Sequence, residues 1–136
     1  MATAHRRRKL SKSSQTRLLT AVELELMRIL WRLGEGTVHA VMAELPPGRE
    51  LAYTSVSTML RILEQKEFVT SRKEGRGHIY LPAIPKSEYE KTAIRQVVGQ
   101  VFDGAAVSLV RRLVEEETLT KADLGALREI IRKAGR

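Results

Sequence analysis

Residues 53–80 read YTSVSTMLRILEQKEFVTSRKEGRGHIY, and this stretch determines the predicted fold. Its first part repeats apolar residues at helical spacing, so we predict a helix that opens at Tyr53-Thr54, with Thr54 as its N-cap, and ends near Glu67. Its second part changes period around a glycine-rich turn, which predicts a β-hairpin between Phe68 and Leu81. The side chains expected on the buried face of the helix are Val56, Met59, Leu60 and Leu63.

The residues before this stretch predict two further helices. Thr20 and Glu23 have the spacing of a capping box, so the first helix should run from about Thr20 to Leu33. A short second helix is expected from an N-cap at Thr37 through Leu45. Three helices followed by a hairpin form the order of a winged helix-turn-helix, so the predicted fold class is mainly α with a small β-hairpin wing.

The exposed face of the third predicted helix suits a DNA groove. The major groove is about 12 Å wide, so a helix that enters it needs slim side chains that donate hydrogen bonds. Arg61 can pair with a guanine edge, and the hydroxyls can reach phosphates or bases. The predicted recognition residues are Thr54, Ser55, Ser57, Thr58 and Arg61. The predicted wing residues, for backbone or minor-groove contact, are Arg72, Lys73, Arg76 and His78.

Beyond Pro85 the helical pattern returns. Ser87 and Glu90 repeat the capping-box spacing, and further helices are expected from about Ala106 to Glu115 and from Thr120. Three short amphipathic helices have too little mutual surface to be stable alone, and a second copy is the simplest partner. The predicted dimerisation residues are Val97, Val101, Phe102, Leu109, Val110, Leu113, Leu127 and Ile130.

Charge and these patterns divide the chain into three parts. Of the net charge of +8, +6 lies within the first 20 residues, which contain no acid. The six basic residues there are Arg6, Arg7, Arg8, Lys9, Lys12 and Arg17. We predict a basic flexible arm over residues 1–17, a winged-helix DNA-binding domain over residues 18–85 and a helical dimerisation region over residues 86–136. The natural partners of such an arm are polyanions, and the alternative for it is a solubilising tail.

Composition excludes several classes of protein. The chain has no cysteine, which excludes disulfides, thiolate metal sites and cysteine nucleophiles. No apolar run approaches the ~18 residues that span a bilayer, so we expect a soluble, cytoplasmic protein with no membrane partner. His39 and His78 lack spaced partner ligands, and no base and nucleophile occur as a set, so no metal, cofactor or enzymatic activity is expected. Tyr53 and Trp31 are assigned to the core or its edge.

A second class of function fits part of the pattern. The winged helix can be a protein-interaction module, with the arm as a non-specific polyanion-binding tail. Such modules replace the basic wing with acidic or apolar residues, whereas this chain keeps Arg72, Lys73 and Arg76. The charge of the wing therefore favours duplex DNA as the partner.

Three stretches of the chain resemble a known family, the BlaI and MecI penicillinase and methicillin-resistance repressors with their copper-responsive relatives. The stretches are residues 19–23 with residues 29–31, residues 51–64 and residues 72–80. The resemblance implies a homodimer that places two winged helices on a palindromic operator and blocks transcription, with the C-terminal helices forming the dimer.

The resemblance also implies how DNA is released. In the antibiotic-resistance members a membrane sensor protease triggers cleavage of the C-terminal region, and the equivalent bond here joins Arg112 and Leu113. The Asn-Phe pair of the family is missing at this position, so a regulatory protease is a partner implied by the resemblance alone. The copper-responsive branch ends in a cysteine cluster, and the absence of cysteine excludes copper sensing by that route.

Overall fold

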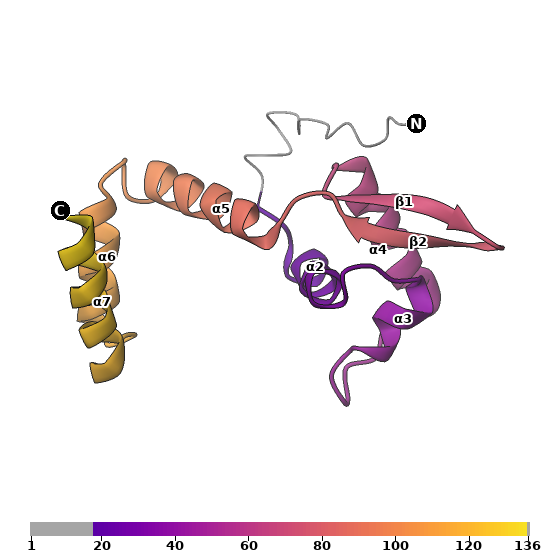
Figure 1. Ribbon diagram of the computed structural model, residues 1–136, viewed down its shortest axis with the longest axis horizontal. Helices are drawn as coiled ribbons and strands as arrows, with labels where there is room; N and C mark the ends of the chain where they lie inside the picture. The colour runs from indigo at the N-terminus through magenta and orange to yellow at the C-terminus, as the bar shows by residue number, and fades with distance from the viewer. Residues whose placement is uncertain (1–17, 136) are drawn as a thin grey trace. The chain divides into compact units, whose positions relative to one another are not determined.

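The computed structural model describes residues 18–135, and the predicted basic arm lies outside the described residues. The fold class predicted from the sequence is confirmed: the described residues form helices and one antiparallel β-hairpin (Figure 1). The elements are α2 (Ala21–Leu33), α3 (Val38–Ala43), α4 (Tyr53–Gln65), β1 (Val69–Glu74), β2 (Gly77–Pro82), α5 (Lys86–Gln100), α6 (Ala106–Glu115) and α7 (Lys121–Ala134). The chain forms two compact units, one ending at Ile94 and the other beginning at Arg95. No helix of residues 18–135 has the length and apolarity to cross a membrane.

Side-chain caps start the first two helices as their sequences predict. The Thr20 amide donates to Glu23 Oε1 at 2.9 Å, and the Glu23 amide donates to Thr20 Oγ1 at 3.2 Å. At α3 the Ala40 amide donates to Thr37 Oγ1 at 3.0 Å. Each bond satisfies a backbone donor that the first helical turn leaves without a partner. Local sequence is therefore enough to place both helix starts.

Two predicted caps are wrong. The N-cap of α4 is Ala52, whose backbone is extended, and no side chain caps this helix. Thr54 instead lies inside the first turn and is exposed. The helix α5 begins at Lys86, so Ser87 lies inside it and cannot cap it; the Pro85 carbonyl accepts from the amides of Glu88 and Tyr89. These carbonyl contacts are the ordinary first hydrogen bonds of a helix and do not replace a side-chain cap.

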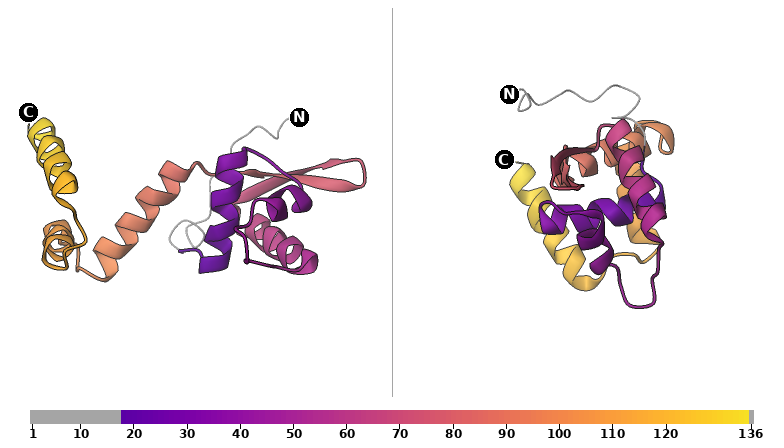
Figure 2. Two further views of the ribbon diagram at one scale, coloured as in Figure 1. Left: turned by 90° about the horizontal axis from the view of Figure 1, so that it is seen from below. Right: turned by 90° about the vertical axis from the view of Figure 1, so that its right-hand side faces the viewer.

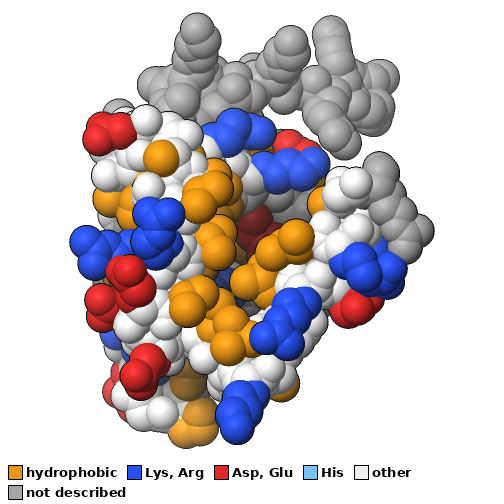
Figure 3. Space-filling model, turned by 90° about the vertical axis from the view of Figure 1, so that its left-hand side faces the viewer, with side chains coloured by type: hydrophobic (Ala, Val, Ile, Leu, Met, Phe, Trp, Pro, Cys, Tyr) orange, Lys and Arg blue, Asp and Glu red, His pale blue; other side chains and the backbone are white. Residues whose placement is uncertain are grey.

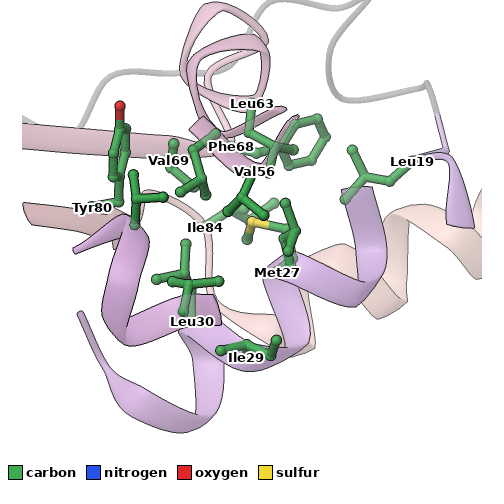
Figure 4. Close-up of a cluster of buried hydrophobic side chains, with 14 of the residues drawn as sticks. Leu19, Met27, Ile29, Leu30, Val56, Leu63, Phe68, Val69, Tyr80 and Ile84 are labelled. Atoms are coloured by element: carbon green, nitrogen blue, oxygen red, sulfur yellow. The ribbon is translucent and has the colours of Figure 1, made fainter. Parts of the chain in front are cut away.

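The core of the first unit lies where α2 and α4 meet the base of the hairpin (Figure 4). Met59, predicted to be buried, is only partly buried and packs against the rim of this core. Burial of each large apolar side chain contributes about 1.5–3 kcal/mol, so these residues hold α4 against α2. The fully buried side chains are Leu26, Met27, Leu30, Val41, Val56, Leu60, Leu63, Phe68 and Val69.

The hairpin projects from the helices of the first unit (Figure 2). Its register pairs Ser71 with Tyr80 and Lys73 with His78, and Gly75 adopts a positive φ of 62° in the turn. The free edge of β2 carries an isolated bridge to Gly36. The Gly36 amide donates to the Tyr80 carbonyl at 3.0 Å, and the Tyr80 amide donates back at 2.8 Å. The loop after α2 therefore extends the sheet by one position.

Tyr89 anchors the start of α5 in the first unit. Its hydroxyl accepts a buried hydrogen bond from the Leu19 amide at 3.0 Å. Its ring lies 5.9 Å from the Trp31 ring and 6.1 Å from the Phe68 ring, measured between centroids. The first unit consequently extends past residue 85, where the sequence predicts the domain boundary, into the first part of α5.

The second unit buries little of its apolar surface. Neither α6 nor α7 contains a buried residue, although a capping box between Thr120 and Asp123 starts α7. Hydrophobic side chains gather on a surface that Figure 3 shows in orange, with lysine and arginine around them. The exposed large apolar residues of this unit are Val101, Val107, Val110, Val114, Ile130 and Ile131.

Candidate nucleic-acid interface

The predicted recognition residues share the solvent-facing side of α4. Val56, Leu60 and Leu63 turn inward, so the residues between them in the helical repeat turn outward. Ser57 is half-buried, and the Arg61 guanidinium donates to Ser57 Oγ at 3.4 Å. The exposed members of the set are Thr54, Ser55, Thr58 and Arg61.

The predicted wing residues form two groups. Lys73, Arg76 and His78 are exposed at the end of the hairpin, and within residues 18–135 none of them has an ion-pair partner. Lys73 and His78 face each other in register, so their side chains project from the same face of the sheet. Arg72 differs from the other three because carboxylates surround it.

The Arg72 guanidinium makes a forked ion pair with Glu35. Arg72 Nη1 lies 3.0 Å from Glu35 Oε1, and Nη2 lies 2.9 Å from Oε2. Glu74 Oε1 lies 3.5 Å from the same Nη2. The hydrogen bonds with Arg72 lower the pKa of Glu35, and those with Glu35 raise the pKa of Arg72. Sequence analysis missed Glu35, because no local pattern links a loop residue to a strand 37 positions later.

The wing is also attached to α4. Ser71 Oγ donates to Glu64 Oε2 at 2.8 Å. Burial raises the pKa of Tyr80, the negative charge of Glu64 raises it further, and Arg61 acts in the opposite direction. Figure 4 places Tyr80 at the edge of the core with its hydroxyl directed out of the cluster. Arg61 and the base of the wing therefore lie close enough to influence one another electrostatically.

Two ion pairs hold α4 at its ends. Before its start, Arg49 Nη2 contacts Glu25 Oε1 at 3.0 Å and Nε contacts Oε2 at 3.1 Å. After its end, Lys66 Nζ contacts Glu23 Oε2 at 2.6 Å, and the Glu23 side chain is only 3 % exposed. Burial would raise the pKa of Glu23, but hydrogen bonds from Lys66 and Thr20, with the charge of Lys66, lower it.

An exposed aromatic pair lies beside the start of α4. Tyr53, assigned from the sequence to the core or its edge, is 46 % exposed and is not among the hydrophobic residues that pack against the core. Its ring lies 4.8 Å from the His39 ring between centroids, at an interplanar angle of 41°. The pair joins α3 to the first turn of α4, on the part of the surface where the hydroxyls of Thr54 and Ser55 are exposed. Only the tertiary contact between the two helices identifies it.

The second unit presents its predicted residues on amphipathic helices. Val101, Val110 and Ile130 are exposed, and the other predicted dimerisation residues are half-buried. The Arg112–Leu113 bond lies within α6, and Arg112 pairs with Glu115 at 3.6 Å. Among residues 18–135, no three His, Cys, Asp or Glu side chains are grouped as a metal ion would require.

A helix-turn-helix with a hydroxyl-rich exposed face, followed by a basic hairpin, defines the winged-helix class of DNA-binding proteins. Residues 19–133 match the family described as Penicillinase repressor, and the chain belongs to this family. The family consists of DNA-binding transcriptional repressors rather than enzymes, and this chain is one of them.

Two relatives and one solved structure illustrate the similarity. The Penicillinase repressor of Bacillus licheniformis is 26 % identical over 83 % of this chain and 88 % of its own length. The Methicillin resistance regulatory protein MecI of Mammaliicoccus sciuri is 23 % identical over 88 % of this chain and 98 % of its own. The structure titled "The complex structure of hsRosR-S4" covers 77 % of this chain and 94 % of its own, with a TM-score of 0.51 and 18 % identity, a likeness of fold alone.

Proposed function

We propose that the protein acts as a homodimer on a palindromic operator, and that an inducing signal releases it by disrupting the dimer. One observation carries the DNA-contacting part of this proposal. The exposed side of α4 carries Arg61, and Ser71 of the wing is tied to the same helix at 2.8 Å. Helix and wing can thus approach one duplex as a unit. Because the ligand is an operator, we place the action of the protein in the cytoplasm.

The residues of this surface would have separate roles. Arg61 donates one long hydrogen bond to Ser57, which a base edge can replace, so we assign it the readout of a guanine. The exposed hydroxyls of Thr54, Ser55 and Thr58, with that of Ser57, would reach phosphates or bases. Lys73, Arg76 and His78 would contact the backbone, where affinity depends on charge and on salt.

The second unit supports the homodimer. Its helices α6 and α7 have no buried residue, so apolar side chains such as Val110 and Ile130 gain a buried environment only from a partner. A second copy brings the same surface under two-fold symmetry, and a two-fold dimer places its recognition helices on half-sites ~10 bp apart. Binding of the second half-site is then intramolecular, so loss of the dimer is enough to release DNA.

A regulatory protease would act within this unit. The Arg112–Leu113 bond lies in a helix that has no buried residue within its own subunit, so α6 opens at little cost in free energy whenever the two subunits separate. Cleavage there would remove α7 together with the end of α6. The inducing signal itself would then act through the protease rather than on the winged helix.

The experiment that tests the proposal is selection of bound duplexes from a random-sequence library with the purified full chain. We expect an enriched motif with two-fold symmetry and a dimer by analytical ultracentrifugation. Enrichment of no motif, with binding that heparin abolishes equally for all duplexes, would instead favour the polyanion-binding alternative.

The dimer is tested separately in the full chain. The double variant Val110→Asp/Ile130→Asp should sediment as a monomer and lose affinity for the palindrome while it still binds an isolated half-site weakly. The control Gln100→Asp adds a charge at an exposed position of α5 and should leave the dimer intact. A double variant that remains dimeric contradicts the role assigned to the second unit.

A further inference from the structure

We propose that Arg72 is a positioning residue rather than a DNA ligand: with Glu35 it sets the angle of the wing, and Lys73, Arg76 and His78 alone contact phosphates. The inference rests on the proposed DNA-contacting role of the wing. It separates Arg72 from the other three wing side chains, which the sequence treats as equivalent to it. Three observations carry it, namely the faces of the hairpin, the carboxylates around Arg72 and the bridge beside β2.

The two faces of the hairpin follow from its register. Successive strand residues project to opposite faces, and residues directly opposite one another share a face. Ser71 and Lys73, paired with Tyr80 and His78, therefore lie on one face. The Ser71–Glu64 hydrogen bond and the burial of Tyr80 identify this face as the one toward α4.

Arg72 and Glu74 project from the opposite face. The Arg72 guanidinium contacts both Glu35 and Glu74, so this group of three side chains has a formal charge of −1. A phosphate that approached Arg72 would meet Glu35 and Glu74 as well. The face toward α4 carries Lys73 and His78 and no acidic residue of the hairpin. Electrostatics therefore direct the DNA backbone to the face of Lys73 and to Arg76 at the turn.

The Glu35 contact also has the geometry of a brace. Glu35 directly precedes Gly36, which exchanges two backbone hydrogen bonds with Tyr80 at 3.0 and 2.8 Å. A fork of two parallel hydrogen bonds fixes orientation as well as distance, which a lysine at the same position cannot do. Ser71 holds one face of β1 to α4, and Arg72 holds the other face to the loop after α2. The wing is thereby fixed from both sides.

The test compares alanine variants by their salt dependence. The probe is the duplex that the unmodified protein enriches from a random library, and affinity is measured from 50 to 200 mM KCl. Lys73→Ala and Arg76→Ala should each reduce the slope of log K against log salt by about 1.8, because each substitution removes one phosphate contact from each of the two subunits of the dimer. Arg72→Ala should weaken binding by about 2- to 30-fold with the slope unchanged, as expected for a residue that acts through others.

Whether Glu35→Ala weakens or strengthens DNA binding decides whether Arg72 positions the wing or contacts a phosphate. If Arg72 positions the wing, Glu35→Ala weakens binding as Arg72→Ala does, although the two substitutions change the charge in opposite directions. The double variant should then bind no more weakly than either single variant, and Arg72→Lys should not restore affinity. Glu44→Ala, at another exposed ion pair of the same unit, is the control and should have no effect.

Three outcomes would overturn the inference. They are a slope that falls by about 1.8 in Arg72→Ala, tighter binding by Glu35→Ala, and unchanged affinity in both variants. Failure of the proposed function is distinguishable from all three, because the unmodified protein would then enrich no duplex. In that case there would be no specific complex on which Lys73→Ala and Arg76→Ala could change the salt dependence.

Discussion

The ion pair between Glu23 and Lys66 offers a quantitative test of how α4 is held. Glu23→Gln keeps an oxygen for the capping hydrogen bond with the Thr20 amide but removes the charge that Lys66 contacts at 2.6 Å. A hydrogen bond to a charged group is worth about 1.5–3 kcal/mol. Lys66 is 26 % exposed and can turn to water when its partner is lost, so the lower part of this range applies. We expect a loss of about 1.5–2 kcal/mol in the free energy of unfolding at pH 7.

The pH dependence of this stability difference separates the effect of the Glu23 charge from an effect of packing. The pKa of folded Glu23 lies below its ordinary value of 4.5, so its charge contributes stability above that value and loses it as the pH falls through the folded pKa. The difference between the wild type and Glu23→Gln should therefore be full at pH 7 and shrink at acidic pH below 4.5.

Urea denaturation of the full chain at fixed protein concentration, followed by circular dichroism, measures this difference. The matched control is Glu44→Gln, which removes an exposed partner of Arg32 and should change stability by less than about 0.5 kcal/mol. Equal stability of Glu23→Gln and the wild type at pH 7 would refute the reasoning. So would a cost that persists undiminished at pH 3.

Four further substitutions test other parts of the structure. Arg61→Ala should reduce discrimination at one operator position by about 1–3 kcal/mol, measured by titration of single-base variants, and an unchanged ranking of those variants would contradict guanine readout. Thr37→Ala should cost about 1 kcal/mol of unfolding free energy because it removes a real cap, whereas Thr54→Ala should cost less than about 0.5; equal losses would mean that Thr54 caps α4 after all. Tyr89→Phe should cost about 1–3 kcal/mol, since the buried Leu19 amide loses its acceptor, and an unchanged thermal midpoint would show that water replaces the hydroxyl.

Local patterns in the sequence predict the elements of this protein well. The caps at Thr20 and Thr37 involve residues three apart, and the hairpin follows from alternation around Gly75-Arg76-Gly77. The outward-facing side of α4 follows in the same way from the spacing of Val56, Leu60 and Leu63. These features depend on neighbours along the chain, so short-range chemistry determines them.

Local sequence patterns fail to predict the environment of a residue where contacts with distant parts of the chain determine it. Thr54 has the chemistry of a cap, yet the extended backbone of Ala52 starts α4 before it. Tyr53 has an apolar ring, yet the packing of α3 against α4 leaves it exposed beside His39. Tyr89 belongs by sequence to the C-terminal helices, but its ring and hydroxyl are buried in the first unit.

The sequence by itself thus determines a winged helix with an exposed Arg61 and a basic wing, because each of these is a property of one element. The tertiary structure alone determines which basic side chains of the wing are free of carboxylate partners and so available to contact DNA phosphates. Glu35 reaches the Arg72 guanidinium because the Gly36–Tyr80 bridge brings the loop after α2 beside the sheet. A pairing of that kind depends on the register between segments far apart in the chain, and no spacing within either segment encodes it.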